Sequence, residues 1–472
     1  MNESPNTDGN FRHETSAMLK LALPMLVAQL AQMGTGVVDT IMAGRYAAED
    51  LAAIAIGYNF WLPVYLISLG IMLAVTSIVA QHFGAGRIQQ LRRCLPQAVW
   101  LALGLGILSM PLLLFPGPVL DLLNLEATTQ EKSRQYLWAC AWGLPGAALF
   151  QALRCHTQGV GIVRPFAIAS VIGFGANVPL NYAFIYGHWG LPEMGAAGCG
   201  WATAISMWIT PILIAFYIAR SKPLRQYLPE MRIHAPDWPQ MREILVLGVP
   251  IGLTFFLEVA VFSVIAFMIA TQGNTAIAAH QIGFNIYDII YVPLISVGAA
   301  MTTRMGHAIG AGSMPAVSRS LYSGMLISFG VLMLVAPILI WLPDMVARIY
   351  TQDTAIRNLA VTLLQLTSLF VIFDMLAVMT SAALRAFKDT VFPFVVMGIA
   401  YWAVALPLGY WLGLADPESS TYGPRGFWIA MILGIAIAAI LSGWRLQRWM
   451  RQPLDRQPLD RQPPNANHTP DS

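Results

Sequence analysis

Hydrophobic residues occur along this chain in twelve long runs separated by short polar segments. The runs cover residues 16–44, 51–83, 94–115, 134–158, 165–187, 196–219, 243–271, 276–309, 318–342, 357–386, 391–413 and 425–446. Each run is long enough to cross a bilayer as an α-helix, which needs about 20 residues. None shows the alternation typical of outer-membrane strands. The pattern predicts an all-α integral membrane protein with twelve transmembrane helices.

Composition supports a membrane protein. Hydrophobic residues make up 57% of the 472 residues and charged residues 11%, and the mean hydropathy is +0.60. Soluble domains average about 25% charged residues. The four cysteines lie in or beside apolar runs and form no C-x-x-C pair, so we expect them to pack as small residues rather than to form disulfides or bind metal.

Lysine and arginine predict the orientation. With both termini in the cytoplasm, 21 of these residues fall on the inside and 6 on the outside, which together account for the 27 in the chain. This bias follows the positive-inside rule and supports an even number of spans. The net charge of +3 therefore reflects orientation, and we expect no binding to nucleic acid.

The chain contains an internal repeat. "LAAIAIGYN" (51–59) recurs as "IAAHQIGFN" (277–285), and "GAG" (84–86) recurs at 310–312, both at an offset of 226 residues. Further along, the offset becomes 228. Because six is an even number, two halves of six helices run parallel, related by an axis along the membrane normal. Repeats of this kind place a binding site at their interface near the bilayer midplane.

The repeat divides the chain into five parts. They are a polar N-terminal segment (1–15), a first six-helix lobe (16–219), a cytoplasmic basic linker (220–242), a second six-helix lobe (243–446) and a C-terminal tail (447–472). The N-terminus has no cleavable signal pattern, so the first helix serves as the insertion signal. The tail repeats DRQPL and is rich in proline, which predicts disorder.

Acidic residues interrupt four of the predicted helices. Asp39, Glu258, Asp288 and Asp374 have no evident basic partner at mid-membrane depth in their own helices. An ionised group at a helix centre costs about 2.5–3.5 kcal/mol on insertion scales. Such carboxyl groups take up a proton or hold a cation, because desolvation disfavours the bare anion. The alternative is a carboxyl that stays protonated and bonds to a neighbouring helix.

Other polar residues share helix faces with these acids. In the first helix, spacings of three and four place Gln29, Gln32, Gly36 and Asp39 on one stripe, which we expect to face a cavity or the protein interior. The candidate polar residues of a cavity are Gln32, Asn177, Asn181, Gln281, Asn285 and Asp288. For the Asn and Gln residues, hydrogen bonding between helices without substrate contact remains the alternative.

Basic residues are expected near helix ends. Arg154 and Arg385 occupy roughly matching places in the two halves, and cytoplasmic anchoring is the expected role. His307, beside the second "GAG", is expected to be solvated. The chain lacks a Walker motif, so we expect no ATP hydrolysis by that route and no ATPase subunit is implied. An ion gradient would then supply the energy, about 2.3 kcal/mol per charge for each 100 mV.

Several of these segments together resemble the multidrug and toxic compound extrusion (MATE) family. They are "LALPMLVAQLAQMGTGVVDTIMAG", "DLAAIAIG", "NVPLNYAFIYG" and "PIGLTFFLE". The similarity covers all twelve spans, and it is closest to the bacterial NorM branch because Glu258 follows "FFL" and Asp374 lies in the tenth helix.

The resemblance implies a V-shaped, two-lobed transporter of a bacterial inner membrane, monomeric and without a cofactor. It would exchange cationic, amphipathic drugs or dyes for Na⁺ or H⁺. The acid of the first helix corresponds to Asp39, and the cation site of the second half, a candidate Na⁺ site, corresponds to Glu258 and Asp374. Asp288 departs from the family pattern. The sequence leaves the choice between Na⁺ and H⁺ open.

Two other functions fit parts of this pattern. A flippase for lipid-linked saccharides has this kind of repeated fold, but it would more naturally carry a basic cavity for anionic headgroups. A membrane-embedded transferase, with His280 or an acid as its base, would usually carry a large polar catalytic loop, whereas the loops here are short. We therefore expect a transporter rather than an enzyme.

Overall fold

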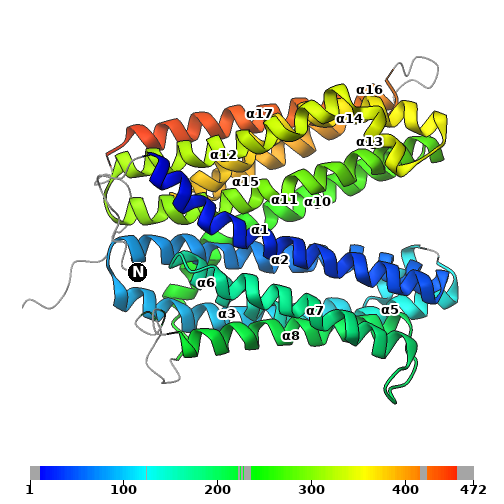
Figure 1. Ribbon diagram of the computed structural model, residues 1–472, viewed down its shortest axis with the longest axis horizontal. Coiled ribbons are helices and arrows are strands. Elements are labelled where there is room, and N and C mark those ends of the chain that lie inside the picture. The colour runs from blue at the N-terminus through cyan, green and yellow to red at the C-terminus, as the bar shows by residue number, and fades with distance from the viewer. Residues whose placement is uncertain are drawn as a thin grey trace, which may run out of the picture.

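The computed structural model describes residues 11–123, 125–221, 224, 227, 235–414 and 422–453. These residues form helices joined by short connections, with no strand among them, which confirms the predicted all-α membrane fold. The helices lie in two groups, one above the other in Figure 1. Most of the predicted tail, much of the basic linker and the first ten residues lie outside the described residues.

The two groups correspond to the two halves of the repeat. The first half consists of α1 (Phe11–Tyr46), α2 (Ala48–Gly84), α3 (Ile88–Leu114), α4 (Gly117–Leu120), the 3-10 turn η1 (Asp121–Leu123), α5 (Ala127–Ala141), α6 (Leu144–Gly159), α7 (Arg164–Tyr186) and α8 (Ala196–Arg220). The second half consists of α10 (Trp238–Ala270), α11 (Asn274–Gly310), α12 (Met314–Trp341), α13 (Pro343–Tyr350), α14 (Thr354–Ala386), α15 (Val391–Gly398), the π-helical η2 (Ile399–Ala405), α16 (Leu406–Gly413) and α17 (Pro424–Arg451).

Eleven helical segments of the described chain are long and apolar enough to cross a membrane. The fourth predicted span, over residues 134–158, is wrong as a single helix because it is broken into α5 and α6. Pro145 lies in the first turn of α6, where its missing N–H needs no partner, and Gly143 precedes that turn. Each piece is too short to cross alone, and together they have the length of one span.

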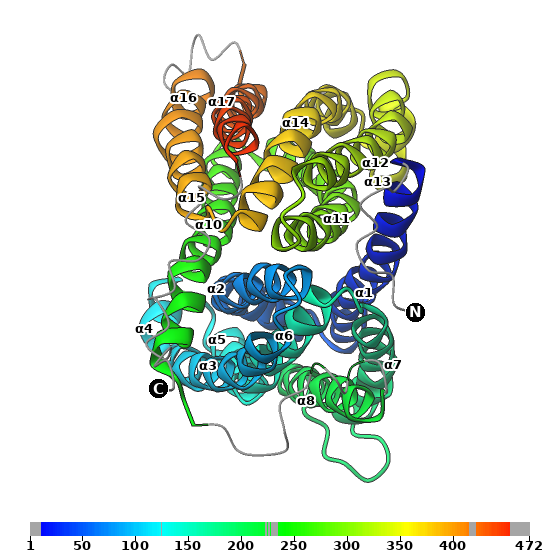
Figure 2. The same ribbon diagram turned by 90° about the vertical axis from the view of Figure 1, so that its left-hand side faces the viewer.

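The first helix of each half crosses to the other half. Near its start, Glu14 of α1 bonds to residues of α11 and α12, whereas Asp39 near the other end of α1 bonds to α7 and α8. The early part of α10 packs against α2, and Leu257 further along accepts a hydrogen bond from Trp402 of η2. Figure 2 shows both helices passing between the two groups on opposite sides. The two halves are therefore interlocked by exchanged helices.

The halves meet closely where α2 and α11 end. A Cβ on Gly84 would lie 2.0 Å from the carbonyl oxygen of His307, and one on Gly310 would lie 2.1 Å from the carbonyl oxygen of Gln81. Gly84 and Gly310 are equivalent in the repeat, as are Gln81 and His307. The contact is therefore reciprocal, as at a two-fold axis. Only glycine permits this approach between the two backbones.

Polar groups join the halves at the same end of the molecule, which we call the closed end. Glu14 accepts hydrogen bonds from Arg304 (Nε to Oε1, 2.9 Å) and from Ser320 (2.7 Å). Gln81 donates to the carbonyl oxygen of Ala386 at 2.8 Å. The described termini of the chain also lie at this end, as the left side of Figure 1 shows for α1 and α17. The closed end is therefore held by both packing and hydrogen bonds.

We expect Gly84→Ala and Gly310→Ala to force α2 and α11 apart at the closed end. Overpacking of this kind costs about 1–3 kcal/mol, so each variant should have a lower Tm than the wild type in detergent. Gly104→Ala is the matched control, because it has no atom within 4 Å of its Cβ position and alanine favours the helix. A Tm for the closed-end variants equal to that of the control would contradict the contact.

Candidate functional site

A cavity of about 910 Å³ lies between the two halves. Residues of α1, α2, α6, α7 and α8 line it from the first half, and residues of α10, α11 and α14 line it from the second. Cavities of this size hold drug-sized molecules. The interface predicted from the repeat therefore contains a space large enough for an organic ligand.

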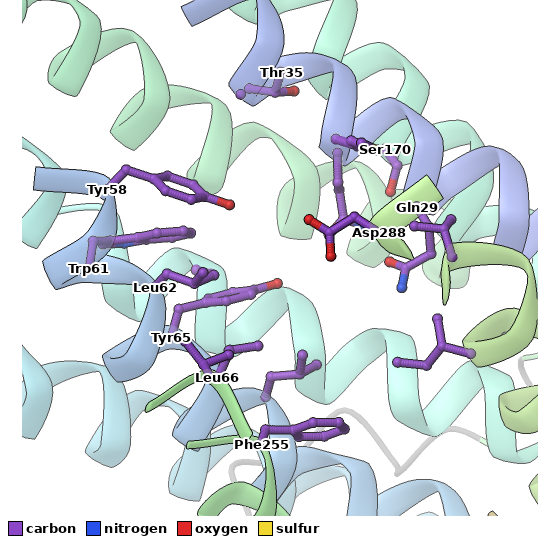
Figure 3. Close-up of a pocket in the computed structure, with 18 of the residues that line it drawn as sticks. Gln29, Thr35, Tyr58, Trp61, Leu62, Tyr65, Leu66, Ser170, Phe255 and Asp288 are labelled. Atoms are coloured by element: carbon purple, nitrogen blue, oxygen red, sulfur yellow. The ribbon is translucent and has the colours of Figure 1, made fainter. Parts of the chain in front are cut away.

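One wall of the cavity is aromatic. Tyr58, Trp61 and Tyr65 follow each other along α2, with centroid distances of 6.0 Å between the first two rings and 4.9 Å between the last two. Spacings of three and four residues place them on one helix face. Figure 3 shows them across the cavity from Asp288, which belongs to α11. The wall offers flat apolar faces opposite a carboxylate.

Asp39 lines the cavity and is held by the first half. Asn181 of α7 donates to its Oδ1 at 2.5 Å, and Thr203 of α8 donates to its Oδ2 at 3.1 Å. Asn177 in turn accepts a bond from Asn181 at 2.9 Å. Both asparagines are fully buried and neither belongs to the cavity lining, so they position the carboxylate from behind. Gln32, on the same stripe as Asp39, lines the cavity.

The acids of the second half lie at two depths. Glu258 and Asp288 line the cavity, together with Tyr287. Asp374 does not line it and is completely buried on α14. Glu258 is nevertheless close enough to Asp374 to interact with it electrostatically. The structure therefore brings together the two residues expected to form the second cation site, one at the surface of the cavity and one behind it.

Asp374 is completely buried and weakly hydrogen-bonded. Neither of its oxygens has a hydrogen bond of good geometry among the described residues, although the side chain of Tyr287 is within reach of a weak one, and the hydroxyl of Tyr401 and the indole N–H of Trp428 also lack partners. Buried polar groups normally find partners, so unpaired ones indicate a missing ligand or a functional site. Carboxylate and hydroxyl oxygens are ligands that suit a hard cation such as Na⁺. The described residues contain no cluster of three His, Cys, Asp or Glu for a metal ion, so further ligands would be neutral oxygens or water.

Four of the six candidate cavity residues lie outside the lining: the two asparagines behind Asp39, and two residues of α11. Gln281 and Asn285 have exposed side chains on α11 and do not line the cavity. Their helix presents Phe284, Tyr287 and Asp288 to the cavity instead. Successive residues point about 100° apart on a helix, so Asn285 faces away although Phe284 faces inward.

Three basic residues differ from expectation. The predicted cytoplasmic anchoring of Arg154 and Arg385 is wrong, because both side chains line the cavity. His307 is buried rather than solvated, and its Nε2 donates to the carbonyl oxygen of Gly159 at 2.7 Å across the two halves. All three lie near helix ends, as the sequence indicates, but at the closed end those helices pack against each other and leave little water.

The aromatic wall was not among the residues singled out from the sequence. Its signal was present, because the spacing of Tyr58, Trp61 and Tyr65 recurs as Phe284, Tyr287 and Tyr291 at the repeat offset of 226. These six rings line the same cavity from α2 and α11. This repeated aromatic stripe, on the two helices that meet at the interface, predicts an aromatic wall in the cavity.

Known proteins share this repeated sequence and architecture. The sequence model of the MatE family matches the chain twice, over residues 24–183 and 250–411. The two matches begin 226 residues apart and end 228 residues apart, the offsets found within the sequence itself. The family model therefore recognises each half separately.

Individual relatives cover nearly the whole chain. The multidrug resistance protein MdtK of Edwardsiella ictaluri (strain 93-146) is 36% identical over 435 residues, which is 92% of this chain and 95% of the relative. The crystal structure of the eukaryotic MATE transporter AtDTX14 has a TM-score of 0.83 at 20% identity and covers 94% of this chain and 99% of its own. A MATE crystal structure in a bent conformation has a TM-score of 0.85 at 20% identity, covering 95% and 98%.

The two buried acids should respond oppositely to replacement by leucine, which has a similar size. Asp374→Leu should stabilise the protein by about 1–2 kcal/mol, because it removes a buried carboxyl group that no hydrogen bond of good geometry satisfies. Asp39→Leu should destabilise it by about 1–3 kcal/mol, because Asn181 and Thr203 lose their acceptor. Thermal unfolding of the purified variants measures both shifts. A lower Tm for Asp374→Leu would show that this side chain has partners that stabilise the fold.

Proposed function

The chain belongs to the MatE family, and on that premise we propose that it is a cation-coupled multidrug efflux antiporter of a bacterial inner membrane. The observation that carries the proposal is the cavity between the halves, which combines an aromatic wall with carboxylates from both halves. The similarity to a protein named for multidrug resistance supports it. The chain would act as a transporter and not as an enzyme, and as a monomer.

The substrates would be cationic, amphipathic small molecules. Flat aromatic faces bind organic cations through their π-electrons and bury apolar surface at the same time. Tyr58 and Trp61 supply such faces, and Glu258 and Asp288 supply negative charge on the other side of the cavity. Several rings and several carboxylates permit different binding poses, which suits a transporter with many substrates. The cavity would recognise the charge and the approximate shape of a substrate rather than bind it through one fixed set of hydrogen bonds.

The coupling ion would compete with the substrate for the carboxylates. Na⁺ or H⁺ would neutralise Asp39 in one half, or Glu258 together with Asp374 in the other. Neutralisation lowers the attraction for an organic cation, and by linkage the bound substrate weakens ion binding by the same factor. Asp374 lies behind Glu258, so it would bind the coupling ion without contacting the substrate.

Transport would require the closed end to open. With both termini in the cytoplasm, as the distribution of Lys and Arg predicts, the closed end faces the cytoplasm and the cavity opens to the outside. The reverse state needs the bonds from Arg304 and Ser320 to Glu14 to break. The bonds from Gln81 to Ala386 and from His307 to Gly159 would also break. A ligand that binds one state more tightly than the other would shift the balance between the two states.

The test is efflux of ethidium, an organic cation, from proteoliposomes under a Na⁺ gradient and a pH gradient imposed separately. We expect one of the two gradients to drive efflux by the wild type. Asp374→Asn should lose at least tenfold in rate, because the amide can neither bind a proton nor hold Na⁺ as a carboxylate does. Asp344→Asn, at an exposed acid of α13, is the matched control and should transport normally.

Two results would contradict the proposal. Equal efflux by Asp374→Asn and the wild type would remove that acid from the coupling site. Absence of ethidium efflux under both gradients, with the protein folded, would exclude organic-cation antiport and favour the flippase alternative.

A further inference from the structure

A second hollow lies at the closed end and shares no lining residue with the cavity between the halves. It is a groove of about 860 Å³ bordered by the start of α10, the connection from α14 to α15 and the end of α17. Figure 2 looks onto the closed end and shows α10, α15 and α17 beside one another at one flank. None of the acids or rings assigned to transport lines this groove, so its residues need an explanation of their own.

Lys388, in the connection from α14 to α15, lines the groove with an unusual backbone. Its φ of +59° lies in the left-handed region, which a lysine seldom adopts. It follows the end of α14, where its N–H donates to the carbonyl oxygen of Arg385 and the N–H of Asp389 donates to that of Leu384. Glycine is the usual residue at this place after a helix. Strained backbone of this kind clusters at functional sites.

The first half has the expected glycine in the equivalent turn. At the end of α6, Gly161 has a φ of +86°, and the same two bonds run from Gly161 to Gln158 and from Ile162 to Thr157. The second half carries a lysine in a turn of the same shape. The turn itself does not require that residue, so the side chain of Lys388 accounts for its presence.

Two cationic groups at the groove have donors that a ligand can use. Lys388 is 14% exposed, and its Nζ lies 2.9 Å from Oε1 of Glu243, which is 44% exposed. An ion pair with such an exposed partner contributes little to stability, so another anion can replace it. Arg242, the neighbour of Glu243 on α10, also lines the groove and pairs with no carboxylate in the described ranges.

The opposite wall holds a third cation in a fixed position. Asp389 accepts hydrogen bonds at 2.7 Å from Nε of Arg445 and from the indole N–H of Trp449. The guanidinium also lies over the rings of Phe392 and Trp449, at 5.2 and 5.8 Å from their centres. Asp389 is 9% exposed and already has two donors, so it offers little to a ligand cation. Three basic and two acidic side chains line the groove, which leaves an excess of positive charge.

The groove also has an apolar side. Val246 and Leu247 line it along α10, and Val249 further along the same helix is exposed. Trp238, at the start of α10, is 63% exposed, as tryptophans at a membrane–water interface often are. The groove therefore has basic groups at the level of lipid headgroups and apolar surface beside them. Basic pockets between helices on the cytoplasmic side of a membrane bind acidic headgroups.

We propose that this groove binds one acidic phospholipid of the cytoplasmic leaflet. Its phosphodiester accepts hydrogen bonds from Lys388 and Arg242 and displaces Glu243, while an acyl chain lies along Val246. The excess positive charge favours phosphatidylglycerol over zwitterionic lipids. This inference goes beyond the proposed function, because the groove is separate from the cavity and would bind lipid whatever the protein transports.

Native mass spectrometry of the purified full chain tests the site, with phosphatidylglycerol, phosphatidylethanolamine and phosphatidylcholine titrated separately. The wild type should bind one phosphatidylglycerol about tenfold more tightly than either zwitterionic lipid, as one charge-assisted hydrogen bond predicts. Lys388→Gly and Arg242→Gln should each lose most of this preference. The Tm of lipid-free Lys388→Gly should not fall, because glycine adopts a φ of +59° without strain, so its loss of preference reports binding rather than unfolding.

Two control variants separate this site from the general charge of the cytoplasmic face. Lys388→Arg keeps the positive charge and should keep most of the preference. Arg448→Gln removes an exposed arginine one turn beyond Arg445 that does not line the groove, and should keep all of it. An equal loss in Arg448→Gln and Lys388→Gly would assign the preference to the whole basic face and overturn the site.

Other results would also overturn the proposal. They are equal affinity of the wild type for the three lipids, and full preference in both Lys388→Gly and Arg242→Gln. Glycerophosphoglycerol, the headgroup without acyl chains, distinguishes a lipid from a soluble phosphate ester. We expect a large excess of it to leave the bound lipid in place, because the apolar contact is missing. Displacement of the lipid by this compound would show that the groove recognises a soluble phosphate ester and not a lipid.

Discussion

The arrangement of the molecule depends on one backbone contact, between the ends of α2 and α11. Gly84 meets the carbonyl of His307 and Gly310 meets the carbonyl of Gln81, so the same contact is made twice about a pseudo-two-fold axis. Glycine is required because a Cβ at either position would overlap the opposing backbone. The cavity lies between the halves that are joined there. A reciprocal contact can also break as a unit, which suits an element with two states.

The carboxyl groups around the cavity receive different numbers of hydrogen bonds. They therefore differ in how readily they bind a proton or a cation. Asp39 receives two hydrogen bonds from its own half, whereas Asp374 receives at most a weak one from Tyr287 among the described residues. A carboxylate with fixed donors remains an anion more readily, and one without donors binds a proton or a cation more readily. The two halves of the repeat have therefore diverged in chemistry while keeping a common backbone. A site with both kinds of acid can bind a substrate cation and a coupling ion in alternation.

Much of the fold was readable from the sequence, because a bilayer constrains it strongly. Long apolar runs, the bias of Lys and Arg and the repeated "GAG" predicted the helices and the two parallel halves. The exchange of α1 and α10 between the halves was not predicted, because hydropathy does not say which neighbour a helix packs against. Gly143 and Pro145 indicate the break between α5 and α6, but the apolar residues continue across it, so hydropathy alone predicts one span.

The candidate site was predicted in its residue types more than in its geometry. The cost of a buried charge identified Asp39, Glu258 and Asp374, yet only three-dimensional packing shows that Asp374 lies behind the cavity wall. Closeness to a helix end predicted that Arg154 anchors its helix at the cytoplasmic face, although the direction of a side chain, not its position along the helix, decides what it contacts. The prediction that Asn285 lines the cavity is wrong for the same reason. Helical spacing groups residues on one face of a helix but does not say which face meets the cavity.

The central claim is that the halves pivot as units, so that closing one end opens the other. Distances between spin labels in reconstituted protein test it most directly, with one pair at Gln89 and Ala311 across the closed end and another at Ala48 and Asn274 across the opposite end. The four native cysteines are buried and leave little background labelling. The account predicts that adding ethidium and adding the coupling ion move the two distances in opposite directions. Distances that stay fixed, or that lengthen and shorten together, would contradict it.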